Sequence, residues 1–328
     1  MPESAVRTFS DPDDYTAVIR ATEVEVTVSA RGSFAAKLIR IDLHQLWMQR
    51  LSESLPRVMH SALVPGRAII TFRTQPGPSM LWSGVDMRAD NITRHSEGHE
   101  AYQLSSGPAR FGAMSLPVED MVSVGETIGG FDLTPPRDTL SVIPSPVAIA
   151  RLHRLHAAAG YLAENAPEII AQPEAARGLE QALIEAMVEC LGERQPDEDR
   201  SAQRRHSLIM RRFRRAVEEN PDRALYIPEL AAAIGVSLST LRTCCHEQLG
   251  ISPKRYLMLR RMEFARRDLR DSAPGMTTVT DIATRYGFFQ FGRFAGEYNS
   301  LFGEPPSATL HRARDSAETG RSNFPNFC

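Results

Sequence analysis

Two segments in the last third of the chain follow one plan, and their first residues lie 52 positions apart. LAAAIGVSLSTLRTCCHEQLGISP occupies 230–253, and IATRYGFFQFGRFAGEYNSLFGEPP occupies 282–306. Each segment starts with an apolar residue and an alanine, places a glycine five residues after the start and ends in Gly-x-x-Pro; the second has one extra residue after the glycine. The repeat predicts two copies of one small helical unit.

Each copy has the local signals of a helix, a tight turn and a second helix. Gly235 and Gly287 fall where the first helix must end, because glycine adopts the left-handed conformation without strain. Ser237 can cap the next helix, and Thr278 with Asp281 has the spacing of a capping box. This is the helix-turn-helix, whose second helix enters the major groove of DNA. The predicted units span 228–249 and 279–302.

A long helix is predicted between the two units, beginning at Ser252–Pro253. One face of it is apolar and arginines are distributed around the rest. The apolar residues are Met258, Met262, Ala265 and Leu269, and the arginines are Arg260, Arg261, Arg266, Arg267 and Arg270. A rigid connector of this kind would suit two readers in successive major-groove segments on one face of the duplex.

Charge is unevenly distributed along the 328 residues, although the net charge is only −2. Residues 201–314 hold 19 Lys and Arg against 11 Asp and Glu, a net charge of +8, which leaves −10 on the remainder. A basic segment joined to an acidic one fits a DNA-binding domain attached to another domain. A solvated charged surface would give the same asymmetry.

The motifs together resemble the C-terminal domain of the AraC/XylS family of bacterial transcription regulators. They are LAAAIGVSLSTL, LGISPKRYLMLRRMEFARRDL and VTDIATRYGFFQFGRFAGEYNSLFGEPPS, and the resemblance covers about 203–313. It implies a regulator of a family typical of activators, which binds double-stranded DNA and works with RNA polymerase. The sequence leaves open the target promoters and whether the outcome is activation or repression.

The resemblance also implies which residues meet DNA. In the first unit, Ser239, Arg242 and Thr243 match the family's base-contacting positions, with His246 near the backbone. Arg242 is the strongest candidate, because a guanidinium can bind guanine O6 and N7 together. Ser239 and Thr243 would equally fit an ordinary solvated helix surface.

The second unit departs from the family pattern. Its exposed positions are Gln290, Phe291, Gly292, Arg293 and Gly296, and Gly296 stands where a polar reader often sits. We expect Gln290 and Arg293 to make most contacts, with Asn299 on phosphate. Whether this unit reads bases or only anchors the protein through the DNA backbone stays open.

The first half of the chain predicts an antiparallel β-sandwich or barrel, so the fold class is α+β. Short β-rich runs, separated by Gly, Pro, Ser or Asp, occur at 24–30, 35–42, 44–51, 67–74 and 109–117. The resemblance implies a cupin-like sensing domain over 21–145, which would bind a small-molecule effector. Residues 1–20 are expected to be a loose lead-in, and 118–145 to be irregular.

Helical patterns follow at 147–164 and 174–192, within a segment 146–192 that would mediate homodimer formation or pack against the β domain. The polar stretch 193–202 is predicted to be a linker, 203–314 the DNA-binding domain and 315–328 a disordered tail. No run approaches the ~18 apolar residues of a membrane span, and the four cysteines fit free thiols in a reducing cytoplasm. A cytoplasmic protein without membrane contact is therefore expected.

The alternative is a cupin-like small-molecule-binding protein or metal enzyme with a vestigial or protein-binding helical module. Its nearest ligands are His95, His99 and Glu100, but the metal-binding cupin pattern is missing and solvated loop histidines fit better. His153 and His156 are expected at the surface or an interface, and Trp47 and Trp82 in the core rather than an effector pocket. We therefore expect no enzyme activity, catalytic residue, metal or cofactor.

Overall fold

The computed structural model describes residues 2–20, 22–98, 100–192, 201–220, 225–272 and 277–312, with only the backbone described for 201–204. The chain divides into two compact units. The first, here the β unit, comprises Met1–Val26 and Phe34–Arg205; the second, here the helical unit, comprises Thr27–Ser33 and His206–Cys328. None of the described helices is both long and apolar enough to cross a membrane.

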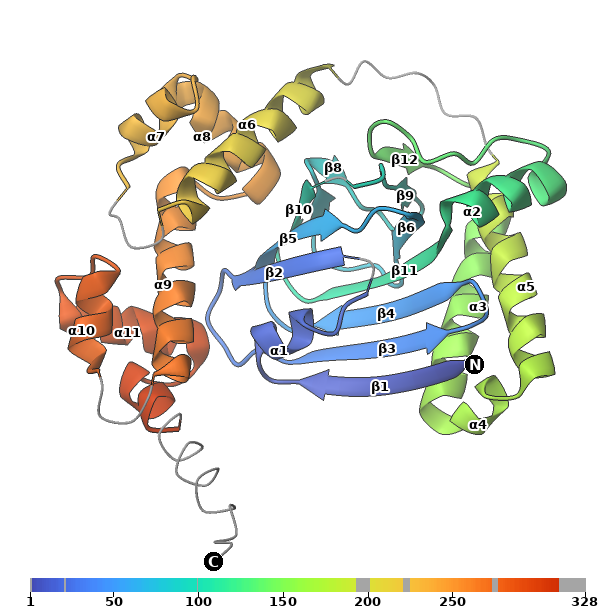
Figure 1. The fold of residues 1–328 in the computed structure, drawn as a ribbon, viewed down its shortest axis with the longest axis horizontal. Helices are drawn as coiled ribbons and strands as arrows, with labels where there is room; N and C mark the ends of the chain where they lie inside the picture. Colours follow the sequence, from blue (N-terminus) through green and yellow to red (C-terminus); the bar gives the residue numbers. More distant parts are fainter. Residues whose placement is uncertain are drawn as a thin grey trace, which may run out of the picture. The chain divides into compact units, whose positions relative to one another are not determined.

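Two sheets that do not close into a barrel form the β unit (Figure 1). The seven-stranded sheet runs in the order β1 (Glu3–Phe9), β3 (Ala36–Asp42), β4 (Trp47–Glu53), β11 (Ala109–Pro117), β6 (Arg67–Arg73), β9 (Ile92–Arg94) and β12 (Leu140–Val142). The five-stranded sheet runs β2 (Thr22–Val28), β5 (Arg57–Leu63), β10 (Glu100–Ser105), β7 (Met80–Trp82) and β8 (Val85–Asp86). The α+β fold with antiparallel sheets is thus confirmed.

The central strand of the larger sheet is β11, which pairs antiparallel with both β4 and β6. Phe111 lies opposite Leu51 on one side and Arg73 on the other. All five predicted β-rich runs became strands, as β2, β3, β4, β6 and β11. Their β-branched and aromatic residues, mixed with polar ones and bounded by Gly, Pro, Ser or Asp, predicted these strands.

The expectation of a loose segment over 1–20 is wrong. Strand β1 pairs with β3 along its full length, from Glu3 opposite Asp42 to Phe9 opposite Ala36. A short helix, α1 (Pro12–Thr16), follows and is capped by the Asp11 side chain. The sequence pattern does not predict this strand because it lies at the edge of the sheet. Its side chains are exposed or half-buried, so its composition is polar.

The stretch 118–145 is also more regular than expected. It contains α2 (Val118–Val124), a short π-helix η1 (Gly125–Gly129) and strand β12. Met121 and Leu133 from this stretch are buried in the main core of the β unit. Sparse, widely spaced apolar residues of this kind give no clear period, so pattern reasoning does not find them.

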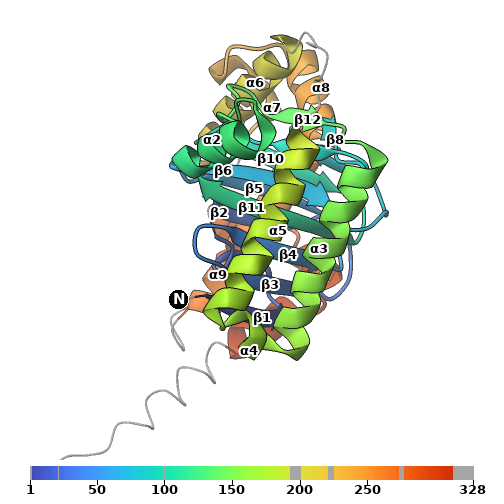
Figure 2. The same ribbon diagram turned by 90° about the vertical axis from the view of Figure 1, so that its right-hand side faces the viewer.

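Helices α3 (Pro146–Asn165) and α5 (Pro173–Leu191) confirm the two helices predicted at 147–164 and 174–192. They are joined through α4 (Pro167–Ile170) and cover one face of the seven-stranded sheet, as Figure 2 shows. Their apolar sides, including Leu152 and Met187, share one core with Met48, Phe72 and other sheet residues. Packing on the β unit therefore accounts for the buried side of both helices.

His156 lies inside this packing, which corrects its expected place at the surface. The side chain is fully buried, its Nδ1 accepts from Arg50 Nη1 at 3.1 Å and its Nε2 donates to the Gln49 carbonyl at 3.2 Å. The strand leaves room for the ring only because residue 112 is glycine: a Cβ there would lie 2.7 Å from the imidazole. The half-buried His153 stacks on Phe72, with ring centroids 5.6 Å apart.

We predict that acid destabilises the β unit through His156. Burial, with a smaller contribution from Arg50, lowers the pKa of His156 from 6.5 to about 3. Between pH 6.5 and 3 the unfolded chain is protonated at this histidine and the folded chain is not. The contribution of His156 to the free energy of unfolding is therefore unchanged above pH 6.5 and falls by about 1.4 kcal/mol per pH unit below it, down to pH 3. Urea unfolding at pH 7 and pH 4.5 should differ by about 2–3 kcal/mol more than in His156→Gln. If the free energy of unfolding depended on pH equally in both proteins, the assigned role of His156 would be contradicted.

A helical stretch at 306–312 ends the described part of the helical unit, and six labelled helices precede it. They are α6 (Ser201–Glu218, whose first five residues fall before the unit's boundary), α7 (Ile227–Ala233), α8 (Leu238–Leu249), α9 (Pro253–Asp271), α10 (Val279–Arg285) and α11 (Phe291–Phe302). Figure 1 shows α9 running from the α7–α8 pair to the α10–α11 pair. The predicted linker lies mostly outside the described residues, as does the predicted tail from 315 onward.

Candidate nucleic-acid interface

The first helix-turn-helix consists of α7, a turn at Gly235 and α8. Gly235 has a φ of +77°, the left-handed conformation that the sequence predicted for it. The Ser237 hydroxyl accepts a hydrogen bond from the Thr240 backbone amide at 3.0 Å and so caps α8. Gly250, with a φ of +63°, ends α8. Local backbone chemistry therefore fixes both ends of this second helix.

The second helix-turn-helix repeats the arrangement with α10, Gly287 and α11. Gly287 has a φ of +72°, and Gly303 ends α11 in the same conformation. The predicted capping box is present: the Thr278 hydroxyl accepts from the Asp281 amide at 3.1 Å, and the Asp281 carboxylate accepts from the Thr278 amide at 3.0 Å. The extra residue after Gly287 lengthens the turn before α11, as the sequence comparison of the copies indicated.

Helix α9 is the physical link between the units. It has 19 residues, which makes it about 28 Å long, and the Ser252 hydroxyl caps its start at the Arg255 amide. Tyr256 packs against Phe213 of α6, with ring centroids 5.7 Å apart. Farther along, Met262 and Leu269 are buried in one core with Phe294 and other residues of the second unit. One continuous helix thus contributes to the packing of both halves.

One face of α8 is exposed and carries all four residues predicted for the first recognition helix. Ser239, Arg242, Thr243 and His246 have the i, i+3, i+4, i+7 spacing of a single helical face, and each is exposed. The opposite face buries Leu241, Cys244, Cys245 and Leu249. Burial raises the pKa of Cys244 to about 11 and of Cys245 to about 12, so both are unreactive thiols.

The arginines on the two recognition helices differ in their surroundings. Arg242 is exposed and takes part in no ion pair within the described part of the chain. Arg293 on α11 is also exposed, but its Nε donates to Glu297 Oε1 at 2.9 Å. The Arg242 guanidinium is therefore available to bind a ligand outside the chain. The Arg293 guanidinium can do so only if it also keeps, or gives up, its ion pair with Glu297.

Helix α11 presents an unusual start. Gln290 occupies the N-cap position, but its side chain does not cap the first amides of the helix. Uncapped amides at a helix N-terminus favour contact with a phosphate. Phe289 and Phe291 flank Gln290 with 75% and 43% of their surface exposed, and Asn299 is exposed two turns later. Sequence reasoning did not single out Phe289, whose exposure depends on the geometry of the turn.

The described candidate metal ligands of the β unit, His95 and Glu100, belong to no cluster of three or more such side chains in the part of the chain that the structure describes. His95 is buried, which corrects its expected place in a solvated loop: its ring packs on Trp82 with centroids 4.2 Å apart, and its Nε2 lies 2.8 Å from Thr71 Oγ1. Glu100 lies on β10, 3.8 Å from His60, and His99 is outside the described residues. No group of three or more metal-binding side chains occurs among the residues described.

A small cavity of about 50 Å³ lies between the two sheets, with Trp47 and Trp82 among its lining residues. Trp82 is 4% exposed, while the Trp47 ring is half-buried with the Arg67 guanidinium 3.7 Å from its centroid. Drug-sized ligands occupy about 300–1,000 Å³, so this cavity, as it stands, is too small for such a ligand. Both tryptophans therefore act chiefly as packing residues in this structure.

The helical unit, with two exposed recognition helices on one connecting helix, defines a double helix-turn-helix protein. A family model described as a helix-turn-helix domain matches residues 230–312. The probable thc operon regulatory protein of Rhodococcus erythropolis is 40% identical over 94 residues, 29% of this chain and 28% of that protein. The XylDLEGF operon transcriptional activator 2 of Pseudomonas putida is 35% identical over 112 residues, 33% of this chain and 71% of that protein.

A probable AraC family transcriptional regulator from Rhodopseudomonas palustris CGA009, of known structure, is 35% identical over 32% of this chain and 97% of its own, with a TM-score of 0.30. The chain spans about three-tenths of the length of the first curated relatives that it matches. The residues matched by the family model lie in the helical unit. The chain belongs to the AraC/XylS family, as the motifs indicated.

Proposed function

We propose that this protein is a sequence-specific, double-stranded DNA-binding transcription regulator that places its two helix-turn-helix units in successive major grooves. The observation that carries the proposal is the pair of exposed recognition faces, on α8 and α11, joined by the single helix α9. The net charge of +8 over 201–314 supports it, because cationic side chains release counterions from phosphates on binding. Binding of the full-length protein to its own upstream DNA in a gel-shift assay is the first test.

Each exposed residue of the first unit has a separate role in this proposal. Arg242 binds a guanine edge, Ser239 and Thr243 contact neighbouring bases, and His246 contacts the backbone. In the second unit Gln290 and Arg293 make most contacts, and Asn299 binds phosphate. The uncapped amides at the start of α11 add a phosphate site, which favours anchoring as the main task of this unit.

We predict that Arg242→Ala weakens binding to the specific site by about 1–3 kcal/mol, or roughly 5- to 150-fold. The exposed guanidinium has no partner in the described chain, so its loss should affect DNA contacts and leave folding unchanged. Gel shifts on the specific site, on single-base variants and on random DNA measure the effect. Preference should relax at one base pair. An equal loss on random DNA would show that Arg242 contacts only the backbone.

A second expected result concerns the ion pair between Arg293 and Glu297. Glu297→Gln should raise DNA affinity about two- to fivefold, since it releases the guanidinium and removes a negative charge from the DNA-facing helix. The same substitution in an Arg293→Ala background is the control and should give a smaller gain. If both backgrounds gain equally, general charge and not the pairing with Arg293 explains the change.

For the β unit we propose regulation of DNA binding by a small-molecule effector, with homodimers formed through α3 and α5. The curated Pseudomonas putida relative is named as a transcriptional activator, which supports activation together with RNA polymerase as the outcome here. We also propose that the protein works in the cytoplasm and catalyses no reaction. Stoichiometric bound metal in purified protein, together with no retarded DNA, would instead favour a metal enzyme.

A further inference from the structure

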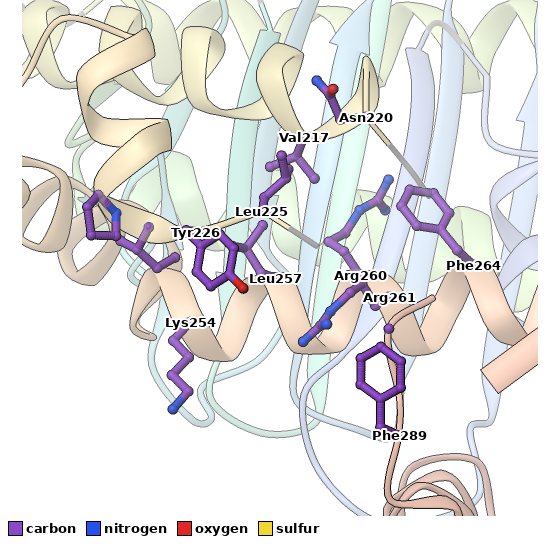
Figure 3. Close-up of a pocket in the computed structure, with 13 residues that line it drawn as sticks. Val217, Asn220, Leu225, Tyr226, Lys254, Leu257, Arg260, Arg261, Phe264 and Phe289 are labelled. Atoms are coloured by element: carbon purple, nitrogen blue, oxygen red, sulfur yellow. The ribbon is translucent and has the colours of Figure 1, made fainter. Parts of the chain in front are cut away.

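A cavity of about 520 Å³ lies within the helical unit, on α9 between the two helix-turn-helix units. Its walls come from the end of α6, the start of α7, one side of α9 and the turn of the second unit. Figure 3 shows Arg261 between Tyr226 and Phe289, and Arg260 beside Phe264. The volume falls in the range of small-molecule sites, and it is about ten times that of the cavity in the β unit.

Apolar groups form most of the cavity wall. Val217 and Leu257 are buried in it, and Phe264 lies farther along α9. Tyr226 and Phe289, which also line the cavity, leave 67% and 75% of their surface exposed. Together with the buried apolar wall they give the cavity a contiguous apolar surface, of the kind that marks ligand-binding grooves. The wall therefore suits a ligand with an aromatic or aliphatic body.

Every charged side chain in the described lining is cationic. Lys254, Arg260 and Arg261 line the cavity, and no carboxylate does so among the described residues. Arg260 is buried, with its guanidinium 4.9 Å from the Phe264 ring centroid. Lys254 is exposed at the start of α9. The charges therefore complement an anion.

Arg261 is the lining residue whose surroundings most favour an anion. Its guanidinium lies 5.1 Å from the Phe288 ring centroid, and its Nε is buried without a hydrogen-bond partner. Burial lowers the pKa of this side chain, and no carboxylate offsets the loss of solvation. Arg261 also lines the cavity, so an anion bound there would offset part of the free-energy cost of burying this charge.

We propose that this cavity binds a small organic anion, a carboxylate or sulfonate on an aromatic or aliphatic body, with Arg261 and Lys254 holding the acid group. Because Ile227 and Gly287 belong to different helix-turn-helix units and both line the cavity, an occupant contacts the two readers at once. Ligand binding therefore changes DNA affinity; this coupling, unlike the binding itself, rests on the proposed function.

The binding test uses 1-naphthoate and its neutral analogue 1-naphthalenemethanol, titrated into the full-length protein by calorimetry. Naphthoate should bind at one site per chain, at least about tenfold more tightly than the alcohol, as expected for a charge-assisted hydrogen bond. Arg261→Met keeps the apolar stem and should remove that preference. Equal affinity for the two probes, or no naphthoate binding, would overturn the proposal.

Two further variants protect the test against a folding defect in Arg261→Met. Lys254→Met alters an exposed cavity residue and should weaken naphthoate binding severalfold, whereas Arg255→Met alters its exposed neighbour outside the cavity and should leave binding unchanged. Equal effects of the two would overturn the proposal. Retardation of DNA is then measured with and without naphthoate. If the two sites are coupled, naphthoate changes the affinity for DNA by the same factor by which DNA changes the affinity for naphthoate. Failure of the proposed function would appear separately, as no retarded DNA under either condition.

Discussion

Two alanines inserted into α9 between Leu257 and Met258 should reduce specific DNA binding by at least about 100-fold. Each added residue turns the rest of a helix by about 100° and advances it by 1.5 Å, so two residues rotate the second unit by roughly 200°. The second recognition helix would then face away from the groove that it must enter. Binding should fall toward the non-specific level, which is typically 10³-fold or more weaker.

The matched control is an insertion of four alanines at the same place. It turns the second unit by only about 40° beyond a full circle and advances it by roughly 6 Å, so it should retain more affinity than the two-residue insertion. Because either insertion disturbs the packing of α9, a change in the DNA offers an independent measurement. Two base pairs added between the contacted segments should weaken binding of the unaltered protein. Equal binding to both DNAs would contradict a fixed separation.

The second large effect is expected in the β unit, where Arg57→Met should lower the free energy of unfolding by about 3–5 kcal/mol. Arg57 Nε donates to Glu53 Oε2 at 2.6 Å, and neither side chain has any exposed surface. Glu53 also accepts from Tyr15 at 2.9 Å, and Arg57 donates to the Gln103 carbonyl at 3.2 Å. Removing the cation leaves a buried carboxylate without its counterion, which is the costly step.

Urea unfolding followed by tryptophan fluorescence measures this effect, because both tryptophans, Trp47 and Trp82, lie in the β unit. The control is Arg88→Met, which breaks an exposed ion pair with Asp90 and should change stability by less than about 1 kcal/mol. The double variant Glu53→Leu with Arg57→Met should recover part of the loss, since no buried charge remains. A cost below about 1 kcal/mol for Arg57→Met alone would contradict the account.

The helical unit was predictable from sequence because its geometry depends on short-range rules. The ends of α7 and α10 follow from Gly235 and Gly287, whose positive φ values only glycine adopts without strain. The start of α10 follows from the capping box of Thr278 and Asp281. These signals act within four residues, so one sequence is enough to place them.

The β unit was less predictable because its features depend on partners far along the chain. Strand β1 is polar and is defined by its pairing with β3, more than 25 residues later. His156 is buried because β11, some 45 residues earlier, has glycine at 112 and so leaves space for the ring. His95 is buried through contacts with Trp82 and Thr71. Composition in a local window carries no information about these partners.

The helical unit likewise contains some features that the sequence predicts and others that it does not. Helical spacing and the family resemblance led to Ser239, Arg242, Thr243 and His246, which share one exposed face. The cavity on α9 was not predictable, because its wall combines four separate segments of the chain. The pairing of Arg293 with Glu297 has the i, i+4 spacing of a helical ion pair, a signal that is present in the sequence itself.

Methylation interference with the full-length protein tests the central claim most directly. Premethylated guanines at N7 block contacts in the major groove, so the guanines that prevent binding map the grooves that the protein enters. The account predicts two clusters of blocked positions, separated by about 10 base pairs and lying on one face of the duplex. A single cluster, or two clusters on opposite faces, would contradict the placement of both units in successive major grooves.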